Sequence, residues 1–571
     1  MTLQLLKFNP GVIKDITEYT AGKNGPFWID SNLVRFQDGY PAKIGGWSKE
    51  DIEGLTASGG ASGVFENPKG VGRKMLFWRA LSDSKDRIVL GTHSHLYIIQ
   101  DGLLYDITPL RKTTNNLSNP LATTDGSTTV TITDSSHGAK TGDFVVIESA
   151  TATGGITADD LNRKSGYQIT LVDSNSYTIT VDSAASSTVS SGGGTSLDVL
   201  YLKGLDGGLG TQTSAPALGW GISTWGSDGW GQAATTPIVT NTLRIWSHDN
   251  FGEDLLINVR NGGIYYWDKT SGLSARAVSL DSLAGSTTAP TIAKQIMVSD
   301  RDRHIIAFGC DTEANPGVQD PLAIRFSSQE SLTDWASTAT NTAGELRLGS
   351  GSEIVTALET RQQILVFTDT TLYSMQFLGP PFTFGVNSLS ENITIASPNA
   401  AIAVDDNVYW MGRAEFYVYS GAVQRLPCMV RDFVFSDINE EQLDKINAAL
   451  NTEHSEIWWY YPSENSTEVN RYVVYNYLEQ VWYYGSFGRT AWIDRGIFDF
   501  PFAANADGYI YEHEIGFDDG TTNPTTPINA FIQSSPIDIG DGEQFMLLRK
   551  MIPDVDFKNS SATLPDVNIT L

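Results

Sequence analysis

Hydrophobic and polar residues alternate along many short stretches of this chain, and one unit built from them recurs seven times. Each unit is a strand rich in aromatic residues, a turn, and a second strand. The units span residues 96–108, 264–278, 323–337, 372–386, 416–428, 471–486 and 510–522. Repeated short strands of this kind are typical of a β-propeller. We therefore predict an all-β fold whose main body is a β-propeller of about six to eight blades.

The positions of the repeats divide the chain into five segments. They are an N-terminal arm (1–60), a first propeller repeat (61–112), an inserted small β-module (113–199), the remainder of the propeller (200–517) and C-terminal strands (518–571). The arm is rich in turns, such as Gly25-Pro26 and Asp38-Gly39. The last residues, VNITL, still follow a strand pattern, so we expect a further C-terminal piece in the natural protein.

The inserted module differs from its surroundings in composition. Residues 113–199 are rich in Thr, Ser, Asp and Gly and contain no Trp, yet stretches such as TVTIT and YTITV keep the two-residue period of strands. Loop closure entropy grows slowly with length, so a surface loop accommodates such an insertion at small cost.

One stretch has the period of a helix instead. We predict an α-helix over residues 436–451, capped by Ser436 or Asp437, because three apolar residues recur at helical spacing. They are Leu443, Ile446 and Leu450. Packing on the edge of a blade and contact with a neighbouring subunit are both open for this element.

Three tryptophans recur every five residues, each beside a glycine, within residues 219–231. They are Trp220, Trp225 and Trp230. Tryptophan is enriched at the centres of protein interfaces, so these residues are candidate interface positions. A loop packed on its own scaffold explains them equally well.

The charge of the chain limits the partners it can bind. Its 571 residues include 66 acidic and 38 basic ones, which gives a net charge of −28. A protein that grips nucleic acid by neutralising phosphates is basic, so that class is excluded. The acidity serves solubility, or it serves to repel DNA.

Cysteine and leader patterns indicate folding in a cytosol. The two cysteines, Cys310 and Cys428, are far apart and make no disulfide framework. The start, MTLQLLKFNPGV, has one Lys and too short an apolar run for a secretory signal. No stretch reaches the roughly 20 apolar residues of a membrane span.

No group of residues predicts catalysis. His93 and His95 share one strand face, but no third metal ligand lies near them in the sequence. The stretch FSSQESLTDWAS (326–337) resembles the Asp-box turn of sialidases, without its Asp and Gly in place. We therefore predict a protein that is not an enzyme, with no catalytic residue, no cofactor and no metal site.

Longer phrases of the sequence carry a family resemblance. Residues 8–47 and 323–354 resemble the start and the middle of many tailed-phage virion proteins. Residues 409–439 are similar to the late blade and linker of the tail nozzle, or tail tubular, proteins of short-tailed phages, and residues 534–557 resemble the platform strands of those proteins. Residues 137–181 are similar to a small β-module that recurs in phage structural proteins. The matches cover most of the chain and contain no catalytic motif.

The resemblance implies a structural virion protein of the phage tail, assembled in the bacterial host cytoplasm. Such proteins form homohexameric rings below the portal and the head-to-tail adaptor. The N- and C-terminal segments would form a β-rich platform for the adaptor, and the propellers would surround the DNA exit channel and hold tail fibres, spikes or a tail-tip needle. Double-stranded DNA would pass without tight binding, because acidic walls repel phosphate.

Four residues of the arm are candidates for contact with a neighbouring subunit or the adaptor. They are Trp28, Arg35, Phe36 and Trp47. Packing within one subunit is an equal alternative for each. The alternative function is a glycan-binding or glycan-hydrolysing β-propeller of a phage tail or a bacterium, in which the tryptophans at 220, 225 and 230 would pack on sugar rings.

Overall fold

The computed structural model divides into two compact units. One, which we call the terminal unit, contains Met1–Glu50 and Asn399–Leu571, and the other, the central unit, contains Asp51–Pro398. The structure describes residues 5–23, 26–203, 209–212, 242–520, 526–537, 550–557, 560 and 567–570.

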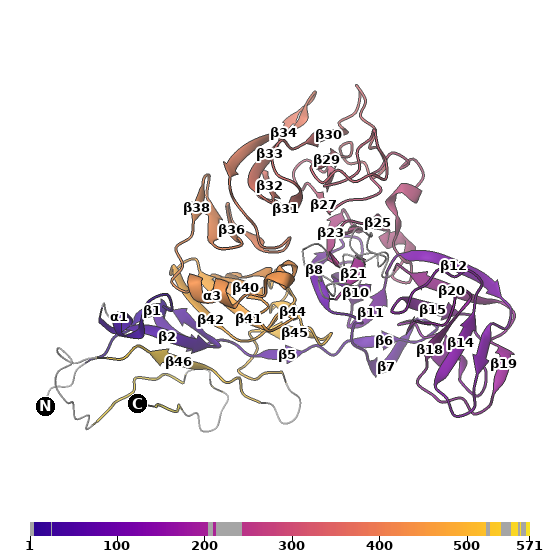
Figure 1. The fold of residues 1–571 in the computed structure, drawn as a ribbon, viewed down its shortest axis with the longest axis horizontal. Coiled ribbons are helices and arrows are strands. Elements are labelled where there is room, and N and C mark those ends of the chain that lie inside the picture. The colour runs from indigo at the N-terminus through magenta and orange to yellow at the C-terminus, as the bar shows by residue number, and fades with distance from the viewer. Residues whose placement is uncertain are drawn as a thin grey trace, which may run out of the picture. The chain divides into compact units, whose positions relative to one another are not determined.

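Four-stranded antiparallel sheets, each made of strands in chain order, are the main elements of the central unit (Figure 1). The first, β8 (Gly72–Arg79), β9 (Asp86–Thr92), β10 (Leu96–Gln100) and β11 (Leu103–Asp106), is extended to six strands by two more. These are β6 (Glu53–Leu55), which pairs parallel with β11, and β7 (Ala61–Phe65), which pairs antiparallel with β6. The next is β23 (Trp246–Phe251), β24 (Asp254–Val259), β25 (Ile264–Trp267) and β26 (Val278–Ser279). The others are β27 (Gln295–Val298), β28 (Ile305–Phe308), β29 (Ala323–Phe326) and β30 (Gly344–Arg347), then β31 (Ile354–Glu359), β32 (Ile364–Thr368), β33 (Thr371–Gly379) and β34 (Thr383–Glu391).

The terminal unit contains three sheets of the same kind. The first contains β35 (Ala401–Val404), β36 (Asn407–Met411), β37 (Phe416–Tyr419) and β38 (Val423–Arg425). The second contains β39 (Asn447–Asn451), β40 (Glu456–Tyr461), β41 (Arg471–Asn476) and β42 (Val481–Gly485). The last contains β43 (Ala491–Ile493), β44 (Phe502–Ala504), β45 (Ile510–His513) and β5 (Trp47–Lys49). Seven blade-like sheets in the described residues confirm the predicted all-β, β-propeller fold.

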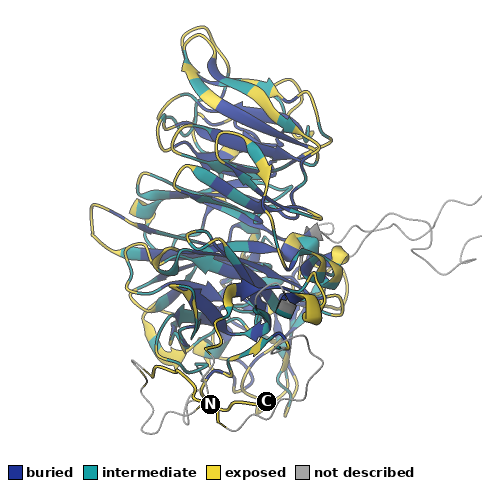
Figure 2. Ribbon diagram, turned by 90° about the vertical axis from the view of Figure 1, so that its left-hand side faces the viewer, coloured by how far each residue is buried: buried dark blue, intermediate teal, exposed yellow. Residues whose placement is uncertain are grey.

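Buried middle strands explain why these sheets stack. Every residue of β32 is buried, and one apolar core joins Phe308 of β28 to Val366 of β32 in the next sheet. Figure 2 shows the same pattern, with strands buried and connecting loops exposed. A strand covered on both faces reads as a continuous apolar run rather than as an alternation, which is how ILVFT appears in the sequence.

The repeat recognised in the sequence corresponds to the third and fourth strands of a sheet. Five of the seven units contain both strands. In residues 323–337 the second predicted strand is instead a turn, because the fourth strand, β30, begins later at Gly344. In residues 510–522 the fourth strand comes from the other end of the chain.

That strand is β5, which pairs antiparallel with β45 so that Trp47 lies opposite His513 and Lys49 opposite Tyr511. The sequence assigns residues 47–49 to the N-terminal arm, whereas the structure pairs them as the fourth strand of this sheet. The two ends of the chain therefore complete one sheet within the terminal unit.

The inserted β-module has two sheets that share one core. One contains β12 (Leu110–Leu117), β20 (Leu197–Leu202), β15 (Phe144–Glu148) and β16 (Tyr167–Gln168). The other contains β17 (Thr170–Leu171), β18 (Ser176–Thr180), β14 (Thr129–Thr133), β13 (Leu121–Thr123) and β19 (Val189–Gly192). Val145 and Val199 of the first sheet pack with Val130 and Ile179 of the second. A short helix, α2 (Ala158–Leu161), is capped by Thr157.

The N- and C-terminal segments also form a small sheet. In it β2 (Phe27–Asn32) lies between β1 (Asn9–Val12) and β46 (Phe531–Ser534), followed in the chain by the hairpin β3 (Val34–Gln37) and β4 (Tyr40–Lys43). The remaining elements are α1 (Glu18–Lys23), the paired strands β21 (Leu209–Thr211) and β22 (Thr242–Leu243), and the 3-10 turns η1 (Lys269–Ser271) and η2 (Leu280–Ser282).

The predicted helix over residues 436–451 is wrong. The structure has the helix α3 (Arg431–Asp437), the 3-10 segment η3 (Glu440–Lys445), the strand β39 and the 3-10 turn η4 (Thr452–His454). Asn439, not Ser436 or Asp437, caps η3 by accepting a hydrogen bond from the Glu441 amide at 3.0 Å. Pairing of β39 with the aromatic strand β40 outweighs local helix propensity here.

We expect Trp47→Ala to destabilise the sheet that joins the chain ends. The Trp47 ring stacks on Phe487 with centroids 5.1 Å apart, and the Arg489 guanidinium lies 5.1 Å from it. Loss of these contacts should lower the free energy of unfolding by about 2–4 kcal/mol. Urea unfolding followed by circular dichroism measures this, with Tyr40→Ala, an exposed residue of β4, as the control. Equal midpoints for the two variants would contradict the expected role of β5.

Candidate functional site

The contact residues predicted from the sequence do not gather at one surface. Arg35 and Phe36 of β3 are buried in the interior of the terminal unit, which is the packing alternative stated for them. Trp28 and Trp47 are half-buried, and Trp28 packs on Phe8 with centroids 4.4 Å apart. Contact with a partner stays a prediction for these two tryptophans.

The tryptophan loop is the other predicted site. Its residues Trp220, Trp225 and Trp230 lie outside the described residues.

A buried ion triad centred on Arg35 connects β3 to the last two sheets of the terminal unit. Its Nε and Nη2 donate to the two carboxylate oxygens of Glu456, on β40, at 2.8 and 3.0 Å. Its Nη1 and Nη2 donate to the carboxylate of Glu514, which follows β45, at 2.9 and 2.6 Å. One guanidinium thus binds two carboxylates in the fork geometry that arginine favours.

Further donors complete this triad. Glu456 also accepts hydrogen bonds from the Trp458 indole, at 3.0 Å, and from the Tyr483 hydroxyl. Glu514 accepts from the Asn451 amide at 3.0 Å and from the Gly45 backbone at 3.1 Å. Two carboxylates and one guanidinium carry a net charge of −1, and these donors stabilise the excess negative charge.

The triad sets the protonation of its carboxylates. Burial raises the pKa of Glu514, but the Arg35 guanidinium and His454 together more than offset burial and hold that pKa well below its usual range. Burial lowers the pKa of Arg35, and the two carboxylates more than reverse the effect. The sequence carried one signal of this site, since Glu456 is the one charged residue of the strand EIWWYY.

A cleft of about 240 Å³ opens beside the small sheet of the same unit. It is lined in part by Lys14, Asp30, Phe433, Arg471, Tyr484 and Phe531. The Tyr484 hydroxyl donates to Asp30 at 2.8 Å, and the Lys14 ammonium lies 5.7 Å from the Phe433 ring. Arg471 also lies 3.6 Å from Asp437. Cationic and aromatic side chains in one cleft suit a ligand that carries both carboxylates and apolar groups.

In the central unit, polar side chains join the first strands of successive sheets. Asp249 of β23 accepts a hydrogen bond from the Val298 amide of β27 at 2.9 Å. Gln295 of β27 both donates to and accepts from the Ala357 backbone of β31 at 2.7 Å. Glu359 of β31 accepts from the Asp300 amide at 3.2 Å. Neighbouring sheets are therefore connected by side chains where no strand pairing joins them.

Two of these carboxylates are poised to hold protons near neutral pH. Burial raises the pKa of Asp249 to about 6, and the nearby Asp300 adds to the effect. Burial likewise raises the pKa of Glu359 to about 7, with Asp300 and Asp249 contributing.

His93 and His95 contact backbone and aromatic groups of the first sheet. His93 Nδ1 accepts from the Val71 amide at 2.9 Å, and His95 stacks on Tyr97 with centroids 5.3 Å apart. Burial lowers the pKa of His95 to about 4, so this ring is neutral at physiological pH. Across the described part of the chain, no three His, Cys, Asp or Glu side chains are placed to share a metal ion.

Cys310 and Cys428 are free thiols, the first buried and the second half-buried. Within the ranges that the structure describes, no helix is both long and apolar enough to cross a membrane.

Comparisons with known proteins give no family. No protein-family profile and no curated protein matches this chain. Among solved structures, the phage phi92 endosialidase is 10% identical, with a TM-score of 0.20, covering 93% of this chain and 75% of that one. The AfRom2 CNH domain is 10% identical with a TM-score of 0.29, covering 50% of this chain and 84% of that one. The Neurospora crassa Pan2 WD40 domain is 9% identical with a TM-score of 0.29, covering 52% of this chain and 76% of that one. Likenesses this low carry no argument about function, and the fold assignment rests on the sheet topology.

We expect Arg35→Met to lower the free energy of unfolding by about 3–5 kcal/mol, because two buried carboxylates lose their counter-ion. Arg35→Lys should recover little of this, since an ammonium cannot bind both carboxylates in the same fork. The control is Arg79→Met, which removes an exposed two-point pair with Asp86 and should cost less than about 1 kcal/mol. Chemical denaturation at pH 7 measures all three, and similar losses for Arg35→Met and Arg79→Met would contradict the prediction.

A second prediction concerns pH. Since burial raises the folded-state pKa values of Asp249 and Glu359, their carboxyls destabilise the folded protein increasingly as the pH rises from about 4 through about 6 and 7. The stability of Asp249→Asn/Glu359→Gln relative to the unmodified protein should therefore increase over this range, on the order of 1–2 kcal/mol. Thermal melts at pH 4.5, 6 and 7.5 test this against Glu330→Gln, an exposed carboxylate. A difference that does not change with pH would refute it.

Proposed function

We propose that this chain is a structural subunit of a phage tail, a nozzle that assembles as a homohexameric ring below the portal and adaptor and forms the DNA exit channel. The observation that carries the proposal is an exposed apolar stretch at residues 550–557, in which Met551, Ile552, Val555 and Phe557 are 42–58% exposed. Four large apolar side chains in eight exposed residues indicate a surface that is covered in an assembly.

The net charge supports the same function. The chain has a net charge of −28, the same sign as DNA phosphates, and a ring of such subunits would repel DNA that passes through it. Repulsion keeps the DNA from adhering to the wall, and salt moderates it over a Debye length of about 8–10 Å.

The family resemblance of the sequence supplies the partners. The platform segments would bind the head-to-tail adaptor, and the propeller would hold tail fibres, spikes or a tail-tip needle. The protein would reside in the virion after assembly in the host cytoplasm.

A second candidate function is glycan binding, and the cleft of the terminal unit favours it. Phe433 and Tyr484 offer aromatic faces for sugar rings, and Lys14 and Arg471 would bind an acidic sugar. Binding of acidic oligosaccharides that is lost in Phe433→Ala would support this function, and unchanged binding in that variant would exclude the cleft as its site.

The nozzle proposal predicts a ring in solution. Native mass spectrometry should give a mass six times the chain mass of 62.2 kDa, and negative-stain class averages should show six-fold symmetry around a hole. DNA mixed with the ring at 0.15 M salt should not be retained. A monomer that also fails to assemble on purified adaptor would overturn the proposal.

A further inference from the structure

We propose that residues 550–557 of one copy add as a β-strand to the outer edge of β46 in a second copy, with one face of the added strand toward the neighbouring cleft. This inference rests on the proposed ring and names the contact that would close it. The experiment below separates failure of the contact from failure of the ring.

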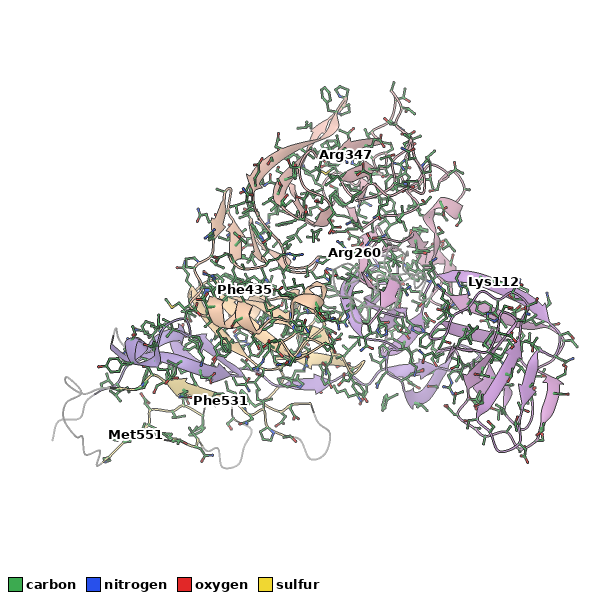
Figure 3. The ribbon with its side chains drawn as sticks, in the orientation of Figure 1. Lys112, Arg260, Arg347, Phe435, Phe531 and Met551 are labelled. Atoms are coloured by element: carbon green, nitrogen blue, oxygen red, sulfur yellow. The ribbon has the colours of Figure 1, made fainter. Side chains whose placement is uncertain are left out.

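The donor stretch, KMIPDVDF, has the pattern of a strand without forming one in its own chain. Its residues are all exposed and outside helices and strands. Met551, Pro553, Val555 and Phe557 fall on alternate positions, which places them on one face of an extended chain. Figure 3 labels Met551 of this segment and Phe531 of β46. A segment with this pattern is suited to pair with an existing sheet edge.

The acceptor is the edge of the small sheet. β46 pairs with β2 on one side, and no other strand of the described residues pairs with its opposite side. Phe531, the first residue of β46, is 48% exposed and also lines the cleft. An unpaired edge offers backbone hydrogen-bonding groups, and the cleft offers contacts to side chains.

Charge selects a second copy of this chain as the occupant. The stretch carries Asp554 and Asp556, whereas Lys14 and Arg471 lie in the cleft. Asp30 of the same lining accepts hydrogen bonds from the Tyr484 hydroxyl and the Ser31 amide, and Arg471 pairs with Asp437 at 3.6 Å. The Lys14 ammonium, which donates to the Ile29 carbonyl, is therefore the cation of the cleft that would attract an acidic segment of another copy.

The symmetry of a ring is consistent with the donor segment of one copy binding the acceptor edge of the next. A ring needs two different surfaces on each subunit, so that each binds the next head to tail. A donor segment and an acceptor edge are two such surfaces on one chain.

The test uses the full chain with either surface disabled. Val555→Asp/Phe557→Asp disables the donor, and Phe531→Glu disables the acceptor. Leu81→Glu, at a residue that is 91% exposed elsewhere, is the control for adding a charge to the surface. Circular dichroism and thermal melts establish that each variant is folded. We expect native mass spectrometry to find rings for the unmodified protein and for Leu81→Glu, and monomers for each disabled variant.

Mixing the two disabled variants gives the sharpest result. The intact donor of one can bind the intact acceptor of the other, but the resulting pair has no functional surface left. We therefore expect a one-to-one dimer and nothing larger. Rings formed by both disabled variants, or a mixture that stays monomeric, would overturn the inference while leaving a ring of the unmodified protein as it is.

A labelled peptide of sequence KMIPDVDF provides a measurement that needs no ring. Fluorescence anisotropy should show saturable binding to the donor-disabled variant, at least tenfold weaker binding after Phe531→Glu is added, and weakening between 0.1 and 0.5 M NaCl. Binding of the peptide to a protein that stays monomeric would support the contact and count against the ring. Absence of binding would overturn the contact, whatever the oligomeric state.

Discussion

Arg35 fixes the position of β3 in the terminal unit, because its single guanidinium binds carboxylates of two different sheets. Glu456 belongs to β40 and Glu514 follows β45, so the charge on β3 fixes the distance between these strands. Buried ion pairs often add little net stability, since desolvation offsets their attraction. They do penalise every arrangement in which one partner is left unpaired. The triad therefore specifies where β3 and the adjacent β5 lie, and apolar packing supplies most of the stabilisation.

The sequence predicted the repeated sheets well, because each repeat is local and its aromatic strands are continuous. It failed where distant residues decide the structure. Leu443, Ile446 and Leu450 have helical spacing, yet residues 447–451 form β39 because β40 is available to pair with them. Arg35 lies 421 and 479 residues from its two partners, so no local pattern could identify the triad. The sequence suggested that Arg35 contacts another subunit or packs internally, and its burial favours internal packing.

Acidic residues have two separate roles in this chain. Most contribute to the net charge of −28. A few, such as Asp249 and Glu359, accept backbone hydrogen bonds between neighbouring sheets and are stabilised in their protonated form by burial. Composition cannot distinguish the two groups. The cleft beside β46 shows the opposite arrangement, with two cations at a surface of an acidic protein.

The sheet shared by the chain ends has a consequence for synthesis on the ribosome. β5 ends at Lys49, and its partner β45 begins at Ile510, 461 residues later. At roughly 5–20 residues per second, β5 waits about 25–90 s for its partner to emerge. During that interval it is an unpaired strand beside a growing chain of other strands. β5 is only three residues long and contains Ser and Lys, and both features limit its pairing with wrong strands. The short strand that completes the last sheet is therefore also one that exposes little pairing edge during synthesis.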